Sequence, residues 1–289
     1  MAAFNICKIA INDFHYLFDD LIDSVVASLQ DLGHECSVSV NEMRLDATNI
    51  LIGSIIFDEL LISSALSHPY IVYQMEILDD QLGHLKNYPN YLNFLSRAQS
   101  IWEYSPKNVA YLRSKGLSNV EYVPPGYHPV NEKVTWRNSP HNFDFLFIGS
   151  LSQRRIAFLE GLIKRGYSVG AITDTNKAFG AQRDQAIADS KVVLNIHCFE
   201  DLNNLETVRI SYLLANKAVV ISESSDHDPY RGGIGFADYE VLSEHCISML
   251  TDASSLEGRS KMGYLAIKNF DMPALIGQAL RRINIHSTS

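Results

Sequence analysis

Charged side chains fall at expected strand-to-helix turns in the second half of the chain. In the stretch LETVRISYLLANKAVVISE (205–223), Glu206 and Arg209 lie three positions apart at the start of an expected helix, with Thr207 between them. Residues at this spacing share one helix face. A carboxylate accepts hydrogen bonds from a sugar diol, and a guanidinium neutralises a diphosphate. An ordinary ion pair on the helix surface is the alternative.

A second charged turn follows the expected strand 143–150. Gly149 and Ser150 end this strand, and Arg154 and Arg155 fall in the first turn of the next helix. A helix N-terminus favours anions, so arginines are unfavourable there unless an anion is bound. Backbone N–H groups and guanidinium groups could both contact phosphate oxygens at this turn. The pattern predicts phosphate contact, with two solvated arginines as the alternative.

Two further features of the second half of the chain could contact a ligand. His197 directly follows the expected strand 191–197, so it either contacts a bound donor or lines a wall through hydrogen bonds. The segment SDHDP (225–229) contains an Asp-x-Asp pattern, but two carboxylates alone make a poor cage for a metal ion. We therefore predict no metal site.

The elements that must position these residues alternate between strand and helix. Strands are expected at 4–12, 34–40, 49–56, 70–76, 100–105, 119–124, 143–150, 167–173, 191–197 and 218–223, and helices at 19–33, 91–98, 106–116, 153–166, 181–190, 205–216, 238–252 and 271–285. The strands are apolar on both faces, which indicates parallel sheets covered by helices. The predicted fold class is α/β, with two Rossmann-like, doubly wound parallel-sheet domains.

The stretch 123–142 interrupts this alternation, because it is rich in proline, asparagine and charge. We predict an N-terminal domain at 1–130, a linker at 131–142 and a C-terminal domain at 143–270. The remaining segment, 271–289, contains an amphipathic helix that we expect to pack back toward the N-terminal domain.

Ligands of parallel sheets gather at the carboxyl ends of the strands. In the first domain, Asp13 and His15 follow the first strand and Glu76 follows the fourth. These three side chains are the candidates for a general base, which a displacement at a sugar carbon needs if configuration inverts. If configuration is retained, no such base is required.

Composition excludes several classes of protein. The net charge of the 289 residues is −9, with no long basic run, which makes nucleic acid an unlikely partner. The four cysteines stand singly, as in proteins of a reducing compartment. No signal-peptide pattern and no apolar run of about 18 residues occurs, so we predict a cytoplasmic protein without a transmembrane segment.

Several motifs resemble a known family. VPPGYHP (123–129) looks like the interdomain motif of GT-B glycosyltransferases. FDFLFIGSLSQRRIAFLEGL, VVLNIH, LETVRISYLLANKAVVISE and GGIGFADYEVL are similar to the group 1 glycosyltransferase superfamily, in particular to its CgeB-like, spore-protein-associated branch. The resemblance implies two domains that face a cleft. It also implies a nucleotide-sugar donor on the second domain.

The resemblance further implies roles for individual residues. Gly149 and the arginines after it would lie at the donor diphosphate, and the loop from Thr173 onward near the base. The helix with Glu206 and Arg209 would hold ribose and phosphate. Many relatives carry a glutamate five residues before a glycine, where this chain has Ser211 and Asn216. Either Glu206 takes over the diol contact, or the donor is held differently.

The predicted function is metal-independent transfer of a sugar from a nucleotide-diphosphate sugar to a hydroxyl acceptor. The nucleotide sugar is a co-substrate, and no other cofactor is expected. One alternative is a sugar-nucleotide epimerase or hydrolase on the same scaffold, and another is a non-catalytic sugar-nucleotide-binding protein. A DNA-modifying glycosyltransferase is disfavoured by the net charge of −9.

Overall fold

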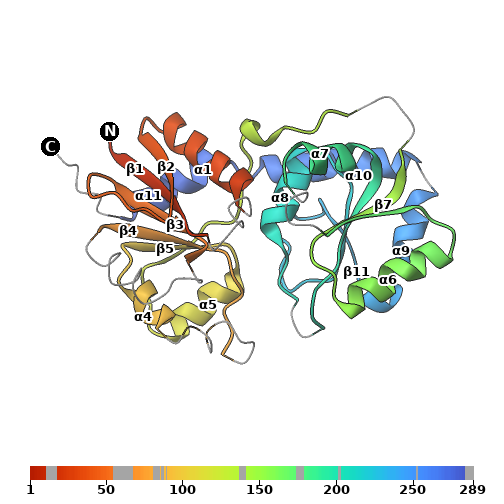
Figure 1. The fold of residues 1–289 in the computed structure, drawn as a ribbon, viewed down its shortest axis with the longest axis horizontal. Coiled ribbons are helices and arrows are strands. Elements are labelled where there is room, and N and C mark those ends of the chain that lie inside the picture. Colours follow the sequence, from red (N-terminus) through yellow and green to blue (C-terminus); the bar gives the residue numbers. More distant parts are fainter. Residues whose placement is uncertain are drawn as a thin grey trace. The chain divides into compact units, whose positions relative to one another are not determined.

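The computed structural model describes residues 1–10, 18–54, 68–80, 85, 88, 90–136, 141–173, 179–200, 203–251 and 253–283. The chain divides into two compact units. Unit 1 comprises Met1–Gly126 and Asp271–Ser289, and unit 2 comprises Tyr127–Phe270. Each unit is built on its own parallel sheet (Figure 1).

The described part of unit 1 forms a six-stranded parallel sheet of order β2-β1-β3-β4-β5-β6. Its strands are β1 (Ala3–Lys8), β2 (Glu35–Val40), β3 (Thr48–Ile52), β4 (Tyr70–Gln74), β5 (Ser100–Glu103) and β6 (Val120–Tyr122). Its helices are α1 (Asp19–Asp31), α4 (Tyr91–Ser96), α5 (Pro106–Ser114) and α11 (Met272–Arg281). β2 and β3 pair with opposite edges of β1, so the winding direction switches there.

Helix α11 brings the end of the chain into unit 1. The side chain of Asp271 caps it by accepting a hydrogen bond from the Ala274 N–H at 3.0 Å. Its apolar face, with Met272 and Ile276, is buried, and it packs beside α1. Arg282, directly after α11, also forms an ion pair with Glu121.

The described part of unit 2 forms a five-stranded parallel sheet of order β11-β10-β9-β7-β8. The strands are β7 (Phe143–Ile148), β8 (Val169–Ile172), β9 (Ser190–Asn195), β10 (Val220–Glu223) and β11 (Gly235–Ala237). The helices are η2 (Pro129–Asn131), α6 (Gln153–Lys164), α7 (Ala181–Ala188), α8 (Thr207–Ala215), α9 (Tyr239–Leu250) and α10 (Ala253–Lys268). These two sheets confirm the predicted pair of parallel α/β domains.

Unit 2 has a separate apolar core on each face of its sheet. Alternate residues of β7 point to opposite faces, as the period of a strand requires. Leu146 and Ile148 pack with residues of α7, α8 and α10, whereas Phe145 and Phe147 pack with residues of α6 and α9. The described helices therefore cover both faces of the sheet.

Three elements of unit 2 have no counterpart among the predicted ones: the short 3₁₀ helix η2, strand β11 and helix α10. The sequence of α10 contains two glycines and has little amphipathic character, so no helical period is evident. Gly263 has a packing role instead, since a Cβ there would lie 2.8 Å from Leu214 Cδ2 and 3.0 Å from the Gly233 carbonyl oxygen. Close approach of α10 to α8 thus explains a glycine within the helix.

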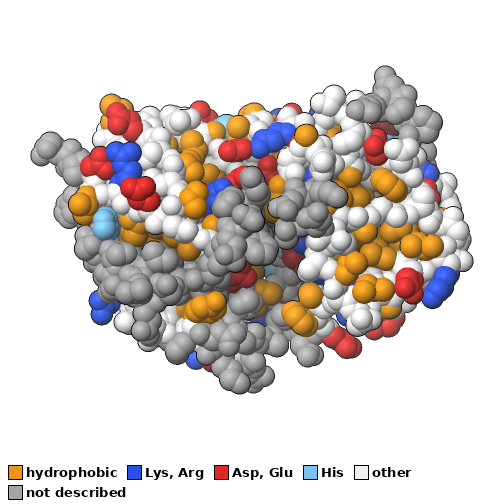
Figure 2. All heavy atoms as spheres, viewed as in Figure 1, with side chains coloured by type: hydrophobic (Ala, Val, Ile, Leu, Met, Phe, Trp, Pro, Cys, Tyr) orange, Lys and Arg blue, Asp and Glu red, His pale blue; other side chains and the backbone are white. Residues whose placement is uncertain are grey.

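Across the described residues, no helix has both the length and the apolar character needed to cross a membrane. On the face shown in Figure 2, lysines and arginines are interspersed with acidic side chains over the described surface. This distribution agrees with the acidic net charge of −9.

Candidate functional site

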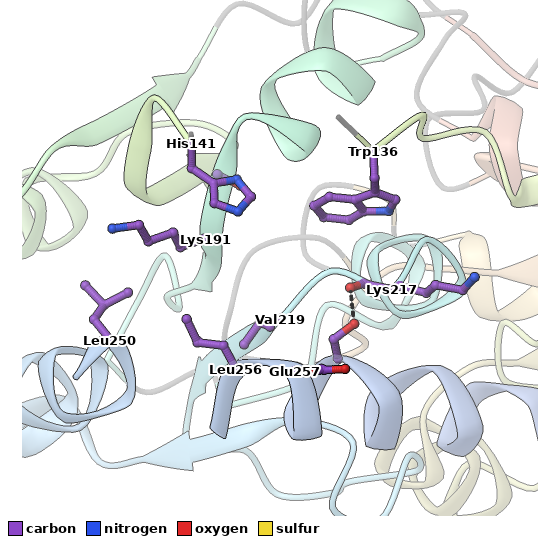
Figure 3. Close-up of a pocket in the computed structure, with 10 residues that line it drawn as sticks. Trp136, His141, Lys191, Lys217, Val219, Leu250, Leu256 and Glu257 are labelled. Atoms are coloured by element: carbon purple, nitrogen blue, oxygen red, sulfur yellow. Dashed lines mark hydrogen bonds between the residues drawn. The ribbon is translucent and has the colours of Figure 1, made fainter. Parts of the chain in front are cut away.

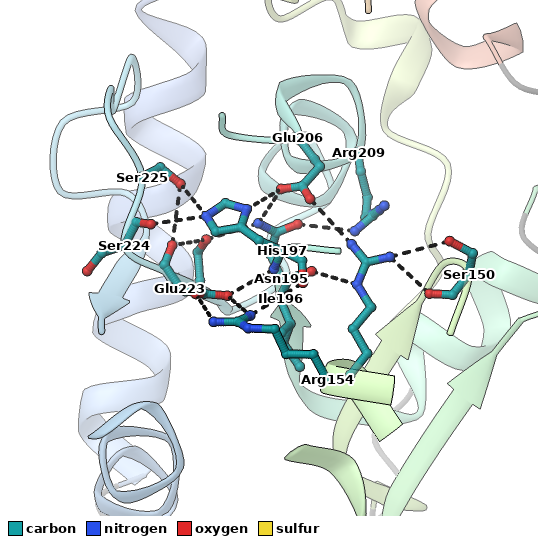
Figure 4. Close-up of polar contacts among 12 residues, drawn as sticks. Ser150, Arg154, Asn195, Ile196, His197, Glu206, Arg209, Glu223, Ser224 and Ser225 are labelled. Carbon is teal, nitrogen blue, oxygen red and sulfur yellow. Dashed lines mark hydrogen bonds and ion pairs between the residues drawn. The ribbon is translucent and has the colours of Figure 1, made fainter. Parts of the chain in front are cut away.

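The carboxyl ends of β7 and β9 lie where the winding direction of unit 2 switches. β8 pairs with one edge of β7 and β9 with the other. In doubly wound sheets the connections diverge at such a point and leave a crevice outside the strand ends. Polar side chains from the β7–α6 turn, the ends of β9 and β10, and the N-terminus of α8 meet there (Figure 4).

Gly149 lets a guanidinium approach the backbone at the end of β7. Its φ is +144°, and a Cβ on it would lie 3.3 Å from Nη2 of Arg209. Arg209 donates through Nη1 to Asn195 Oδ1 at 3.1 Å. Burial and the nearby Arg155 lower the pKa of Arg209, and the charge of Glu206 opposes this shift. Among the described residues, the Asn195 amide is the one hydrogen-bond acceptor that this guanidinium has.

Glu206 lies at the N-cap position of α8, but its carboxylate caps no backbone N–H group. Its Oε2 instead accepts from Asn195 Nδ2 at 2.7 Å and lies 3.6 Å from His197 Nδ1. Burial alone would raise the pKa of Glu206, but the interactions with His197, Arg209 and Asn195 outweigh burial and lower it. Glu206 is therefore an ionised carboxylate whose side chain keeps 28% exposure.

His197 is 3% exposed, and both of its ring nitrogens face oxygen atoms. Nε2 lies 3.0 Å from the Ser224 carbonyl oxygen, which can only accept, so Nε2 carries a hydrogen. Nδ1 faces the carboxylate of Glu206. Burial lowers the pKa of His197, but Glu206, the Ser224 carbonyl and Glu223 together raise it above its usual value. The site therefore favours the imidazolium form.

Arg155 is 4% exposed, and its hydrogen bonds link two segments of the site. Its Nε donates to the Ile196 carbonyl at 2.8 Å and its Nη1 to the Ser150 carbonyl at 2.9 Å. Its Nη2 lies 3.5 Å from Glu206 Oε1. Arg155 thus ties the turn after β7 to the end of β9. The N–H groups of its guanidinium therefore already donate hydrogen bonds within the protein.

Arg154 is also engaged by the protein. Its Nη1 donates to Glu223 Oε2 at 2.6 Å, and its Nη2 contacts Glu223 Oε1. Its guanidinium lies 3.6 Å from the centre of the Tyr239 ring, a cation–π distance. Of the three arginines, Arg209 has the fewest partners, and it is the cation best able to receive an anion.

The N-terminus of α8 adds further donors beside Arg209. The first N–H groups of a helix lack intrahelical partners and favour negative charge. No side chain caps this end. Thr207 is 4% exposed, and its hydroxyl has no hydrogen-bond partner among the described residues. A buried hydroxyl without a hydrogen-bond partner costs free energy, and a bound ligand could supply the missing partner.

The other predicted residues lie as follows. The hydroxyl of Ser150 is 3.4 Å from Arg155 Nη1. Thr173 is exposed directly after β8, and the loop beyond it at 174–178 lies outside the described residues. Asp13 and His15 also lie outside them. Glu76 follows β4 in unit 1, where buried side chains hold its backbone.

Sequence reasoning missed Asn195 and Glu223, which end two buried strands and orient the cluster. Asn195 is 0% exposed and links Glu206 to the hydroxyl of Ser222. A polar residue closing an otherwise apolar strand, as in VVLN or VVISE, was the available signal. Among the described residues, no group of three or more His, Cys, Asp or Glu side chains is arranged to hold a metal ion.

A hollow of unit 2 lies at the amino ends of β9 and β10 (Figure 3). It has a volume of about 570 Å³, and its lining includes Trp136, His141, Ser190, Val219 and Leu256. Ser190 begins β9, and Val219 precedes β10. The hollow is thus distinct from the cluster at the carboxyl ends.

No family model matches the chain. Four uncharacterised proteins of Acanthamoeba polyphaga mimivirus are similar to it. One is 26% identical over 170 residues, covering 57% of this chain and 54% of the relative. Another is 29% identical over 198 residues, covering 66% of each. The chain thus spans about half of the first relative and about two thirds of the second.

Solved structures of glycosyltransferases share the fold. An alpha-glucosyltransferase (AGT) in complex with UDP has a TM-score of 0.65 at 11% identity, covering 99% of this chain and 100% of that chain. HepE of Anabaena, in complex with UDP and glucose, has a TM-score of 0.61 at 11% identity, covering 96% and 98%. TarM has a TM-score of 0.59 at 9% identity, covering 90% of this chain and 58% of that chain. These neighbours are GT-B enzymes, and the likeness is one of fold.

Proposed function

We propose that this chain is a glycosyltransferase that moves a sugar from a nucleoside-diphosphate sugar to a hydroxyl acceptor. One observation carries the proposal. At the switch point of unit 2, Arg209 lies beside Gly149, with Asn195 as its one acceptor among the described residues. Arg209 belongs to the first turn of a helix that no side chain caps, and Thr207, which begins this helix, has a hydroxyl without a hydrogen-bond partner among the described residues. This combination suits a diphosphate.

We assign the donor contacts residue by residue. The guanidinium of Arg209 and the N–H groups that follow Thr207 in α8 would bind the diphosphate, since the Thr207 N–H already donates to the Leu205 carbonyl. Glu206 would accept hydrogen bonds from a ribose or hexose diol, because its carboxylate is ionised and partly exposed. Arg154 and Arg155, expected at the phosphates, would instead position the turn and the strand ends around them. The exposed Thr173 would begin the loop near the base.

UDP is the first nucleotide to test, because the solved structures of AGT and HepE contain it. As the sugar leaves its donor, negative charge grows on the nucleoside diphosphate. Arg209 and the helix N-terminus would stabilise that charge without a metal ion. If the reaction inverts configuration, the general base would come from Asp13, Glu76 or His15 in unit 1.

The proposal is tested by thermal unfolding with UDP, GDP, CDP and dTDP, each with Mg²⁺ and with EDTA. A ligand that binds only the folded state raises Tm. We expect one nucleoside diphosphate to raise Tm, and to do so equally in EDTA. If none of the four changes Tm or gives heat in calorimetry, the donor site is wrong.

Product analysis separates the proposed transferase from its alternatives. The protein is incubated with the UDP sugar that gives the largest shift, with and without a panel of hydroxyl acceptors. A glycosylated acceptor together with free UDP supports transfer. An epimerised sugar nucleotide or free sugar without acceptor supports an epimerase or a hydrolase. Binding without any product supports a sugar-nucleotide-binding protein.

A further inference from the structure

Three buried polar side chains gather at the carboxyl edge of the unit 1 sheet. Gln74 ends β4, Glu103 ends β5, and Asn108 lies in the first turn of α5. Their exposures are 2%, 0% and 0%. Burying polar groups is costly unless each forms hydrogen bonds, so the target of those bonds is informative.

Gln74 and Asn108 both hold the backbone of Glu76. The Gln74 amide accepts from the Glu76 N–H at 3.0 Å and donates to the Glu76 carbonyl at 2.6 Å. Asn108 Nδ2 donates to the same carbonyl at 2.7 Å. Asn108 Oδ1 accepts from the Leu78 N–H at 3.2 Å. The backbone at Glu76 is therefore fixed from two separate elements.

Glu103 fixes Asn108 in turn. A single oxygen, Glu103 Oε1, accepts from Asn108 Nδ2 at 3.1 Å and from the Ser105 N–H at 3.1 Å. The hydrogen bonds therefore form a continuous path from Glu103 through Asn108 to Glu76. Loss of the carboxyl would leave one Asn108 donor unpaired in the interior, where an unpaired donor is costly.

The surroundings of Glu103 favour its neutral form. Its Oε2 has no hydrogen-bond partner, and no cation pairs with it among the described residues. The charges of Glu103 and Glu76 both act on Tyr91, whose hydroxyl forms a hydrogen bond with Ser54. Burial raises the pKa of Glu103 well above its usual value, and the hydrogen bonds from Ser105 and Asn108 only partly offset this.

We propose that Glu103, as a neutral carboxylic acid, and Asn108 are positioning residues that set Glu76 for acid–base chemistry on the acceptor. The inference rests on the proposed function. Of the three candidates for the base, Glu76 is the one that lies within the described residues, and this buried network holds its backbone. Glu76 would contact the acceptor, whereas Glu103 and Asn108 would act through it.

The protonation of Glu103 is tested without any substrate. Glu103→Gln keeps the shape of a neutral carboxyl, whereas Glu103→Leu removes its acceptors. A carboxyl with a raised pKa stabilises the fold most at low pH, and that contribution is lost as pH rises through the raised value. We expect Glu103→Gln to match the wild type in Tm at pH 5 and to exceed it at pH 8. A Tm below wild type at both pH values would overturn the neutral form.

The positioning role is tested by amide exchange and by kinetics. Asn108→Ala should speed hydrogen exchange at Glu76 and Leu78, and should lower kcat by at least about tenfold with the Kd for UDP unchanged. Glu76→Gln should lower kcat by about 10²–10⁴-fold. The double variant should lose little more than Glu76→Gln alone. Asn119→Ala is the matched control, since it removes the hydrogen bond from the Asn119 side-chain amide to the Ala98 carbonyl elsewhere in unit 1.

The outcomes separate this inference from the function on which it rests. Normal kcat in Asn108→Ala, with a large loss in Glu76→Gln, overturns positioning while transfer stands. Equal losses in Asn108→Ala and Asn119→Ala also overturn it. Absence of transfer by the wild type overturns the function and the acid–base role of Glu76. The exchange at Glu76 and the pH dependence of Tm then decide whether the network still fixes that backbone.

Discussion

The guanidinium of Arg154 forms a two-point contact with the carboxylate of Glu223, across 69 positions of sequence. The same carboxylate accepts from the backbone N–H of His197 at 3.0 Å. Arg154 thereby joins the start of α6 to the ends of β9 and β10. Its charge is already matched inside the protein, so the free cationic capacity of the site lies at Arg209.

Replacing Arg209 should weaken UDP binding more than replacing any other arginine of unit 2. We expect Arg209→Ala to cost about 1–3 kcal/mol of binding free energy, the range for hydrogen bonds to charged groups. Arg209→Lys should recover part of the loss, since it keeps the charge without the planar fork. Titration calorimetry measures the effect. Arg165→Ala is the control, because Arg165 pairs with Glu244 on the surface.

Arg154→Ala should act mainly on stability. It leaves Glu223 without its two-point partner at side-chain exposures of 17% and 10%, so we expect a loss of about 1.5–3 kcal/mol. Urea unfolding of Arg154→Ala, Glu223→Gln and the double variant gives the coupling between the two side chains. A fully additive double variant would contradict the pairing. A loss of UDP affinity equal to that of Arg209→Ala would instead support a direct contact of Arg154 with the diphosphate, as expected from the sequence.

The raised pKa of His197 predicts a pH-dependent stability. A histidine whose folded pKa exceeds its unfolded pKa stabilises the fold fully below about pH 6.5, and the contribution is lost as pH rises through the folded pKa. We therefore expect the Tm difference between wild type and His197→Gln to be larger at pH 6 than at pH 9. A constant difference would show that folding does not raise the pKa of His197.

Gly149→Ala should disturb both the backbone and the anion site. Its φ of +144° is unfavourable for any residue with a Cβ, and the added Cβ would press on Arg209 Nη2. We expect a loss of roughly 1 kcal/mol or more in stability, together with weaker UDP binding. Gly161→Ala, in open space on α6, is the control. It should leave UDP binding unchanged and raise stability by up to about 1 kcal/mol, because alanine favours a helix over glycine. If Gly149→Ala binds UDP with unchanged affinity, Gly149 does not lie at the UDP site.

Much of the element order followed from local pattern. The apolar runs at 143–150, 191–197 and 218–223 predict strands, and the structure has β7, β9 and β10 there. Helix α8 was expected at 205–216 and spans Thr207–Ala215. These assignments succeed because a strand buried on both faces and a helix with one buried face differ in the period of their apolar residues.

Helix α10 and the order of the strands were not evident from that pattern. The glycines of α10 weaken its helical signal, and the packing role of Gly263 becomes clear only where α10 meets α8. Likewise, the switch point between β7 and β9 depends on pairings among strands that are distant in sequence. No local period encodes such pairings.

The sequence by itself placed Arg154, Arg155 and Arg209 at the ends of expected strands, because parallel strands bring their carboxyl ends to one edge. It did not reveal Asn195 and Glu223 as their neighbours. Only the tertiary structure decided which of those charges remain available. Arg154, Arg155 and Arg209 are alike as residues, yet Glu223 neutralises the first and backbone carbonyls occupy the second. Glu223 and Ile196 lie 69 and 41 positions away along the chain from the arginines that they contact. The partner of a charged side chain is whichever group lies beside it in the folded protein, and this depends on distance in space rather than on position in the sequence.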